Sequence, residues 1–254
     1  MAHVIAVAGK GGVGKTSLCG LLIQYLGQKG KGPILAVDAD ANSNLNEVLG
    51  VEVETTLGEV REEIERSEMD KNTPIPAGMS KADYAEIRFN NALVEDDDFD
   101  LLVMGRTQGK GCYCYVNGLL SAQLAKYQNH YPYMVVDNEA GMEHLSRNTT
   151  KHTAILVSDC SRRGVQAVGR IAQLIKECDM RPNQVGLIIN RAPGGELNEG
   201  TREEIEKQGL NLLGVVPQDE TVYEYDCAGK PLVELPEDSP VKKALREIVD
   251  NLGL

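Results

Sequence analysis

The chain lacks tryptophan, has only two phenylalanines, and reaches an aromatic content of just 4% over 254 residues. Proteins that bind single-stranded nucleic acid stack bases on aromatic side chains, so this composition argues against that class. No stretch approaches the roughly 20 consecutive apolar residues that a membrane-spanning helix needs. The amino terminus enters an apolar, strand-like segment without a signal-peptide pattern. We therefore expect a cytoplasmic protein that binds neither nucleic acid nor membranes.

The chain also lacks an excess of positive charge. Its formal net charge is -12, which counts against binding to a phosphate backbone. Residues 51–100 alone hold 15 acidic and 5 basic side chains. The polar segment at about 52–98 is therefore expected to be an acidic, largely solvated insertion. The chain length and the 42% of hydrophobic residues suit a single domain that spans residues 1–254 and includes this insertion.

Short apolar runs recur along the chain, and helix-like segments separate them. Apolar runs of this length indicate strands that are buried on both faces. The pattern predicts an α/β fold in which helices cover both faces of a mostly parallel sheet of seven or eight strands. A helix is also expected over residues 57–69, and another over about 241–252. The expected strands are 4–8, 34–37, 101–104, 134–136, 154–158, 185–189 and 212–216.

A glycine-rich segment at residues 9–16, with the sequence GKGGVGKT, fits the phosphate-loop pattern GxxxxGK[ST]. It lies between an apolar strand and an apolar helix. Its glycines let backbone N–H groups turn inward, and the helix N-terminus adds partial positive charge. Lys15 is expected to reach the β- and γ-phosphates, and Thr16 to place its hydroxyl on Mg²⁺. The expected ATP- or ADP-binding residues are Gly11, Gly12, Val13, Gly14, Lys15, Thr16 and Ser17.

Three further strand ends carry polar residues. Asp38 and Asp40 follow one strand and Asp137 follows another, and the carboxyl ends of parallel strands face the ligand crevice. A role as a helix N-cap is the alternative for each aspartate. Asn190, followed by Arg191, offers an amide whose donor and acceptor match N6 and N7 of adenine. The backbone of the segment Pro217, Gln218 and Asp219 is expected to pack beside the base.

Lys10 goes beyond what an ordinary phosphate loop requires. With it, the segment resembles the deviant loop of the septum-positioning (MinD), partition (ParA) and nitrogenase iron protein ATPases. The resemblance implies a homodimer that closes face to face on its nucleotides, with Lys10 reaching the partner's phosphates. It implies that Asp40 orients or deprotonates the attacking water, and that Asp38 and Asp137 lie near Mg²⁺. Residues 138–143 resemble the second switch, in which Gly141 would face the γ-phosphate.

Glu139 stands where that family more often has proline, so the sequence departs from the family at this switch.

The chain has six cysteines, of which only Cys112 and Cys114 are close together. A helix N-terminus and Lys110 nearby would favour their thiolates, the form that binds metal. Two free thiols or a strained disulfide are the alternatives. Of the other cysteines, Cys19 and Cys178 suit a buried core, whereas Cys160 and Cys227 have no assigned role.

Two thiolates fill half of a four-coordinate shell, and a twofold dimer would supply the other half. Tetrahedral Zn²⁺ and square-planar Ni²⁺ both suit four thiolates. The whole chain then resembles the ATPases that insert nickel into carbon monoxide dehydrogenase and acetyl-CoA synthase (the CooC family). The resemblance implies a Mg²⁺-dependent ATPase and metallochaperone that binds Ni²⁺ or Zn²⁺ through Cys112 and Cys114. ATP and metal would each favour its dimer, and either nickel enzyme would be its client.

Three other functions fit parts of the sequence. A regulatory switch of the septum or partition type would need a basic tail or a basic face, whereas this chain is acidic. An iron–sulfur scaffold or electron-donor ATPase could hold a cluster on four thiolates of a dimer. An ATPase whose thiol pair has no function is the third.

Overall fold

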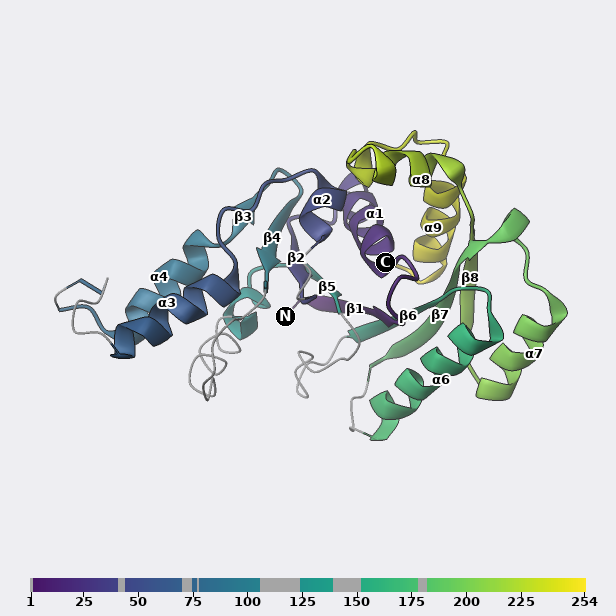
Figure 1. Cartoon of the computed structure of the whole chain (residues 1–254), viewed down its shortest axis with the longest axis horizontal. Coiled ribbons are helices and arrows are strands. Elements are labelled where there is room, and N and C mark those ends of the chain that lie inside the picture. Colours follow the sequence, from purple (N-terminus) through teal and green to yellow (C-terminus); the bar gives the residue numbers. More distant parts are fainter. Residues whose placement is uncertain are drawn as a thin grey trace.

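The computed structural model describes residues 2–40, 44–69, 75–76, 78–105, 124–138, 152–177 and 182–254. Eight strands form one sheet in the order β3-β4-β2-β5-β1-β6-β7-β8, with β1 near its centre (Figure 1). Every pair is parallel except β3 with β4. This confirms the predicted α/β fold with a mostly parallel sheet. The strands are β1 (His3–Gly9), β2 (Ile34–Asp38), β3 (Val94–Glu95), β4 (Phe99–Val103), β5 (Tyr133–Asp137), β6 (His152–Ser158), β7 (Gln184–Ala192) and β8 (Leu212–Pro217).

Helices cover both faces of the sheet. On one face lie α1, α2 and α9; on the other, α3 and α4 cover one half, and α6 and α7 the other half (Figure 1). Within the described residues, no helix is long and apolar enough to cross a bilayer. The helices are α1 (Lys15–Gln28), α2 (Leu45–Leu49), α3 (Leu57–Met69), α4 (Lys81–Asn91), α6 (Arg162–Glu177), α7 (Glu199–Gln208), α8 (Glu220–Cys227) and α9 (Pro240–Asn251), with two short 3₁₀ turns, η1 (Pro193–Gly195) and η2 (Leu232–Glu234).

The alternation of side chains along β1 divides the core into two layers. Ile5 and Val7 point into the cluster beneath α1 and α9, whereas Val4 and Ala8 point into the clusters of the opposite face. All four are buried, as expected of a strand with helices on both sides. The central position of β1 therefore places the loop that follows it at the middle of the carboxyl edge of the sheet.

The acidic segment at about 52–98 holds α3, α4 and β3. Its apolar side chains Val60, Ile64 and Phe89 are buried in the core cluster on that face of the sheet. Glu63 accepts hydrogen bonds from Tyr84 and from Arg88, which joins the two helices. The segment thus contributes to the core through one side of each helix, while most of its acids face solvent.

A candidate nucleotide site at the carboxyl edge of the sheet

The loop between β1 and α1 has the backbone geometry of an anion cradle. Gly12 and Gly14 have φ of 77° and 87°, the left-handed region that favours glycine. A Cβ atom added at Gly11 or Gly12 would meet nothing within 4 Å, so the loop leaves open space in front of its backbone. Gly14 precedes α1 directly, so the N–H groups of the first turn of α1, which have no partner within the helix, follow directly after this loop.

Lys15 is buried, with a relative exposure of 7%, and its Nζ donates a hydrogen bond to the carbonyl oxygen of Lys10 at 3.3 Å. The ammonium group therefore lies over the loop, where an anion of the ligand can replace that carbonyl oxygen. Lys10 is exposed at the tip of the loop.

Asp137, at the end of β5, is the carboxylate most perturbed by burial at this edge of the sheet. It is 1% exposed, and burial raises the pKa of its carboxyl from 3.8 to about 6. The Thr16 hydroxyl and Lys15 lower the pKa, whereas Asp38 and Asp40 raise it. Among the described residues, neither carboxylate oxygen of Asp137 accepts a hydrogen bond of normal geometry. A buried carboxylate beside a threonine hydroxyl fits the oxygen ligands that Mg²⁺ prefers, directly or through water.

Asp38, at the end of β2, has a structural task. Its Oδ1 accepts a hydrogen bond from the Asp40 N–H and its Oδ2 from the Leu45 N–H, both at 3.0 Å. Burial raises the pKa of Asp38, and these backbone bonds lower it. Asp38 therefore anchors both the loop after β2 and the start of α2, although the N-cap residue of α2 is Asn44. Asp40, two residues farther along the chain, lines a cavity at the phosphate loop.

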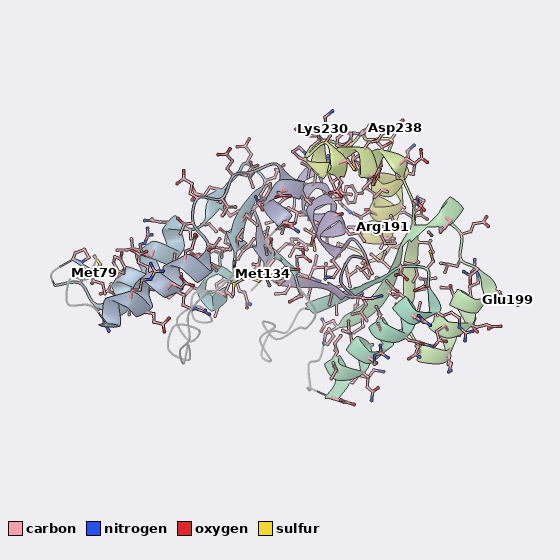
Figure 2. All side chains as sticks on the ribbon, viewed as in Figure 1. Met79, Met134, Arg191, Glu199, Lys230 and Asp238 are labelled. Carbon is pink, nitrogen blue, oxygen red and sulfur yellow. The ribbon has the colours of Figure 1, made fainter. Side chains whose placement is uncertain are left out.

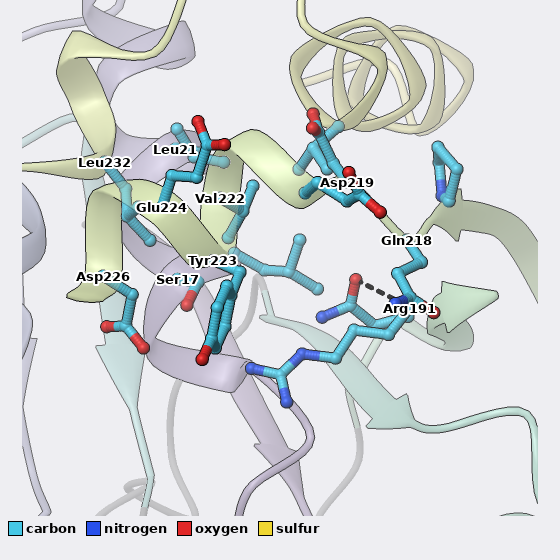
Figure 3. A pocket seen from close by; sticks show the side chains of 15 residues that line it. Ser17, Leu21, Arg191, Gln218, Asp219, Val222, Tyr223, Glu224, Asp226 and Leu232 are labelled. Atoms are coloured by element: carbon cyan, nitrogen blue, oxygen red, sulfur yellow. Dashed lines mark hydrogen bonds between the residues drawn. The ribbon is translucent and has the colours of Figure 1, made fainter. Parts of the chain in front are cut away.

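Two cavities meet at the phosphate loop. The phosphate cavity, of about 880 Å³, runs from Gly11 and Lys15 past α2 to Lys230. Lys230 lies on the loop after α8 and is labelled in Figure 2. The base cavity, of about 830 Å³, lies between α1, the ends of β7 and β8, and α8 (Figure 3). Ser17, Arg191, Asp226 and Leu232 line both cavities, so the two share a wall.

The five residues predicted to contact a base line the base cavity together: Asn190, Arg191, Pro217, Gln218 and Asp219. The Asn190 Nδ2 donates to the Val13 carbonyl at 2.9 Å, and its Oδ1 accepts from the Arg191 N–H at 2.9 Å. The buried amide therefore ties β7 to the phosphate loop. A Cβ atom at Gly14 would lie 2.5 Å from this Nδ2, so the contact requires glycine there.

Arg191 and Asp219 also have partners within the protein. Arg191 has a φ of 56°, unusual for a residue with a side chain, and its Nη1 donates to the Gly12 carbonyl at 3.1 Å. The carboxylate of Asp219 accepts from the Thr221 N–H at 2.9 Å and from the Ser239 hydroxyl at 3.0 Å. Asp219 is thus the N-cap of α8 and ties α8 to the start of α9.

The apolar floor of the base cavity and the aromatic side chain at its mouth were not predicted from the sequence. The floor combines residues from α1, α8, η2 and α9, which lie far apart along the chain. The missed lining residues are Leu18, Leu21, Val222, Tyr223, Leu232 and Val241. Asn138, the first residue of the segment that resembles the second switch, is buried, and its Nδ2 donates to the carbonyls of Val7 and Val136.

The predicted metal ligands Cys112 and Cys114 lie outside the described residues, as do Cys178, Glu139 and Gly141. Cys19 is fully buried in α1, as predicted. Burial, followed by the charges of Asp137 and Asp38, raises the pKa of its thiol, so Cys19 stays neutral beneath the phosphate loop. Cys160 is half-buried, and its Sγ lies 3.7 Å from the Arg191 carbonyl oxygen. Cys227 is exposed on α8.

Comparison with known proteins places this site in a family context. An uncharacterized ATP-binding protein of Methanocaldococcus jannaschii is 43% identical over 251 residues, covering 98% of each chain. The carbon monoxide dehydrogenase accessory protein CooC of Rhodospirillum rubrum is 28% identical, covering 91% of this chain and 89% of CooC. The chloroplast septum site-determining protein MinD homologue of Arabidopsis thaliana is 27% identical over 91% of this chain and 68% of its own length.

The fold itself is found in solved structures. The MinC:MinD cell division protein complex of Aquifex aeolicus contains a chain that superposes with a TM-score of 0.72 at 22% identity, covering 99% of this chain and 96% of that one. The ParA family ATPase of Chlorobium tepidum gives the same TM-score at 20% identity, covering 99% and 98%. Residues 4–232 match the family described as the CobQ/CobB/MinD/ParA nucleotide binding domain. With this match over most of its length, the chain belongs to the CobQ/CobB/MinD/ParA family of nucleotide-binding proteins.

Proposed function

We propose that this protein hydrolyses ATP in a Mg²⁺-dependent reaction. The observation that carries the proposal is the buried carboxylate of Asp137, which lies beside Thr16 without a normal hydrogen bond from any described residue. Thr16 and Asp137 are assigned to the shell of the Mg²⁺ ion. Asp38 is assigned to a position near that shell, where it anchors the neighbouring loop. Bound Mg²⁺ would neutralise charge that develops on the phosphates.

The chain's own residues then have distinct tasks. Lys15 and the loop N–H groups hold the β- and γ-phosphates, and Asp40 orients or deprotonates the attacking water. Lys10, exposed at the loop tip, reaches the phosphates of a second subunit in a nucleotide-bound homodimer. The direct test is phosphate release from ATP by the wild type, Asp40→Ala and Lys10→Ala. Loss of turnover with retained ATP binding in both variants is the expected result, and unchanged turnover in either variant contradicts its role.

We further propose that the dimer is a metallochaperone whose cargo is Ni²⁺ or Zn²⁺. Cys112 and Cys114 of both subunits would hold one ion between them, and hydrolysis would release it to carbon monoxide dehydrogenase or acetyl-CoA synthase. Two observations support this function: the Cys-x-Cys pair and the 28% identity to the CooC accessory protein over 91% of this chain. An interfacial ion links metal binding to dimerisation, because each favours the other.

Equilibrium dialysis against Ni²⁺ or Zn²⁺, with the mass in solution measured in parallel, tests this proposal. The wild type is compared with Cys112→Ala/Cys114→Ala and with the control Cys160→Ala/Cys227→Ala, which removes two other accessible thiols. We expect one tightly held ion per two chains, lost together with the dimer only in the first variant. Equal metal content in all three proteins would remove Cys112 and Cys114 from the mechanism.

A regulatory switch of the septum-site type is the second candidate. The observation in its favour is the similarity to MinD proteins, including the one in chloroplasts of Arabidopsis thaliana at 27% identity. Such a switch would act by ATP-dependent binding to a membrane or a protein partner. Co-sedimentation with anionic vesicles in the presence of ATP, but not ADP, would favour this function over metal delivery.

A further inference from the structure

Tyr223 is the most exposed large hydrophobic side chain among the described residues. It is 71% exposed, whereas Ile87, Leu174 and Leu212 range from 37% to 53%. Its ring nevertheless lies at the mouth of the base cavity, on α8, across from the side chain of Arg191 (Figure 3). An aromatic ring left in water at a cavity mouth gains free energy when a flat apolar surface covers it.

The helix that carries Tyr223 has a fixed position. Asp219 caps its first turn and also accepts a hydrogen bond from Ser239 at the start of α9. The Gln218 N–H donates to the Ala192 carbonyl at 2.9 Å, which joins the segment before α8 to the end of β7. The ring of Tyr223 is therefore presented to the cavity by a rigid support, with only its own side-chain rotations left to settle.

The lining of the base cavity is apolar on one side. Leu18 and Leu21 from α1 and Val241 from α9 supply this aliphatic floor. Asn190 and Asp219 are held by the hydrogen bonds described above, so they frame the cavity at its edge. Tyr223 is the aromatic side chain among the lining residues, so its ring is the one that can stack on a base seated against this floor.

We propose that Tyr223 stacks on the nucleobase and closes the base cavity, so that it is a positioning residue for purine nucleotides. The proposal rests on the nucleotide-binding part of the function proposed above and is independent of its metal-binding part. A purine presents a larger face than a pyrimidine, so the contact favours ATP and GTP over CTP. Because stacking depends on the ring, the phenolic hydroxyl is dispensable for it.

The test compares binding of ATP and of tripolyphosphate, a probe that has the phosphates and lacks the base. The proteins are the wild type, Tyr223→Ala, Tyr223→Phe and the control Cys227→Ala. Cys227 lies one turn later, and its hydrogen bond raises the pKa of Tyr223, but it does not line the cavity. Melting temperatures of the ligand-free proteins check folding, and at 71% exposure the loss of the ring should leave them unchanged.

Loss of base stacking is expected to weaken ATP binding by Tyr223→Ala by roughly 5- to 150-fold. Tyr223→Phe and Cys227→Ala should bind ATP as the wild type does, and all four proteins should bind tripolyphosphate equally. ATP binding by Tyr223→Ala at wild-type affinity overturns the proposal. So does an equal loss of tripolyphosphate binding, or a Tyr223→Phe variant as weak as Tyr223→Ala. These results are independent of the dialysis experiment, so a failure of the metal site is recognised separately.

Discussion

Replacing Asp137 with asparagine is expected to stabilise the protein in the absence of metal and nucleotide. Burial raises the pKa of Asp137 from 3.8 to about 6. Each pKa unit corresponds to about 1.4 kcal/mol, so the ionised carboxylate costs the folded state about 3 kcal/mol. The asparagine side chain carries no charge and avoids this cost. In a domain of this size 1 kcal/mol shifts Tm by about 2–4 °C, so the variant should melt about 6–12 °C higher near pH 8.

The direction of the pH dependence follows from proton binding. Because the pKa in the folded state lies above that of the unfolded chain, the folded protein binds the extra proton between about pH 4 and pH 6. The cost of the charge is therefore absent below about pH 4 and complete above about pH 6. The gain in Tm of Asp137→Asn should follow the same course, and it should vanish near pH 4.

The assay is thermal unfolding in a chelator, from about pH 4 to pH 8, over the range in which Asp137 titrates. Asp238→Asn is the matched control, because Asp238 is exposed on the surface (Figure 2) and its loss of charge should be neutral. Addition of Mg²⁺ and ADP should raise the Tm of the wild type more than that of Asp137→Asn. The reasoning is refuted if the variant melts no higher than the wild type near pH 8, or if it gains equally near pH 4.

Three other predictions concern close contacts at Gly14 and Gly20 and the ion pairs of Glu237. Gly14 has a φ of 87°, and a Cβ atom there would lie 2.5 Å from Asn190 Nδ2. Gly14→Ala should therefore lower the free energy of unfolding, measured by urea denaturation, by about 2–4 kcal/mol. Gly209→Ala, with a φ of 63° and open space, should lose only about 1 kcal/mol; equal losses would contradict the contact with Asn190. Gly20→Ala places a Cβ atom 2.2 Å from Val48 Cγ1, so this variant should have a lower melting temperature than the wild type. Adding Val48→Ala should restore the melting temperature. A double variant no more stable than Gly20→Ala would contradict the contact between α1 and α2. Hydrogen bonds from Arg246 and Lys242 lower the pKa of Glu237 to about 2, so their contribution is present above about pH 4.5 and is lost as the pH falls toward 2. Because Glu237 is 61% exposed, Glu237→Gln should reduce this acid-dependent loss by no more than about 1 kcal/mol, and an unchanged acid titration would count against the pair.

Most of the fold could be predicted from local sequence patterns, since each predicted strand is an apolar run that forms its own element. β3 escaped prediction because it is two residues long, and its antiparallel pairing with β4 depends on the tertiary structure. α4 also escaped prediction, although Ser80 and Asp83 were a readable signal. The Ser80 Oγ accepts a hydrogen bond from the Asp83 N–H at 3.1 Å, the pattern of an N-cap.

In the candidate site too, the part built from one continuous segment was predictable from the sequence, and the part built from distant segments was not. The phosphate loop is one continuous segment, so its glycines and Lys15 could be read from spacing alone. The base cavity could not be, because its walls come from α1, β7, β8, α8, η2 and α9. Tyr223 and Tyr225 are two residues apart in α8, and only the structure shows that Tyr225 packs on the core while Tyr223 lines the cavity.

The wall shared by the two cavities has a consequence for ligands that fill only one of them. Ser17, Arg191, Asp226 and Leu232 border both spaces, so an adenosine fragment and a triphosphate fragment would each meet the same four residues. The ribose of an intact nucleotide acts as a short tether, and tethering replaces a second encounter from solution by an intramolecular one. The affinity of the whole nucleotide should therefore exceed what the two fragments suggest separately. For inhibitor design, the group that links the two fragments past these four residues therefore matters as much as either fragment.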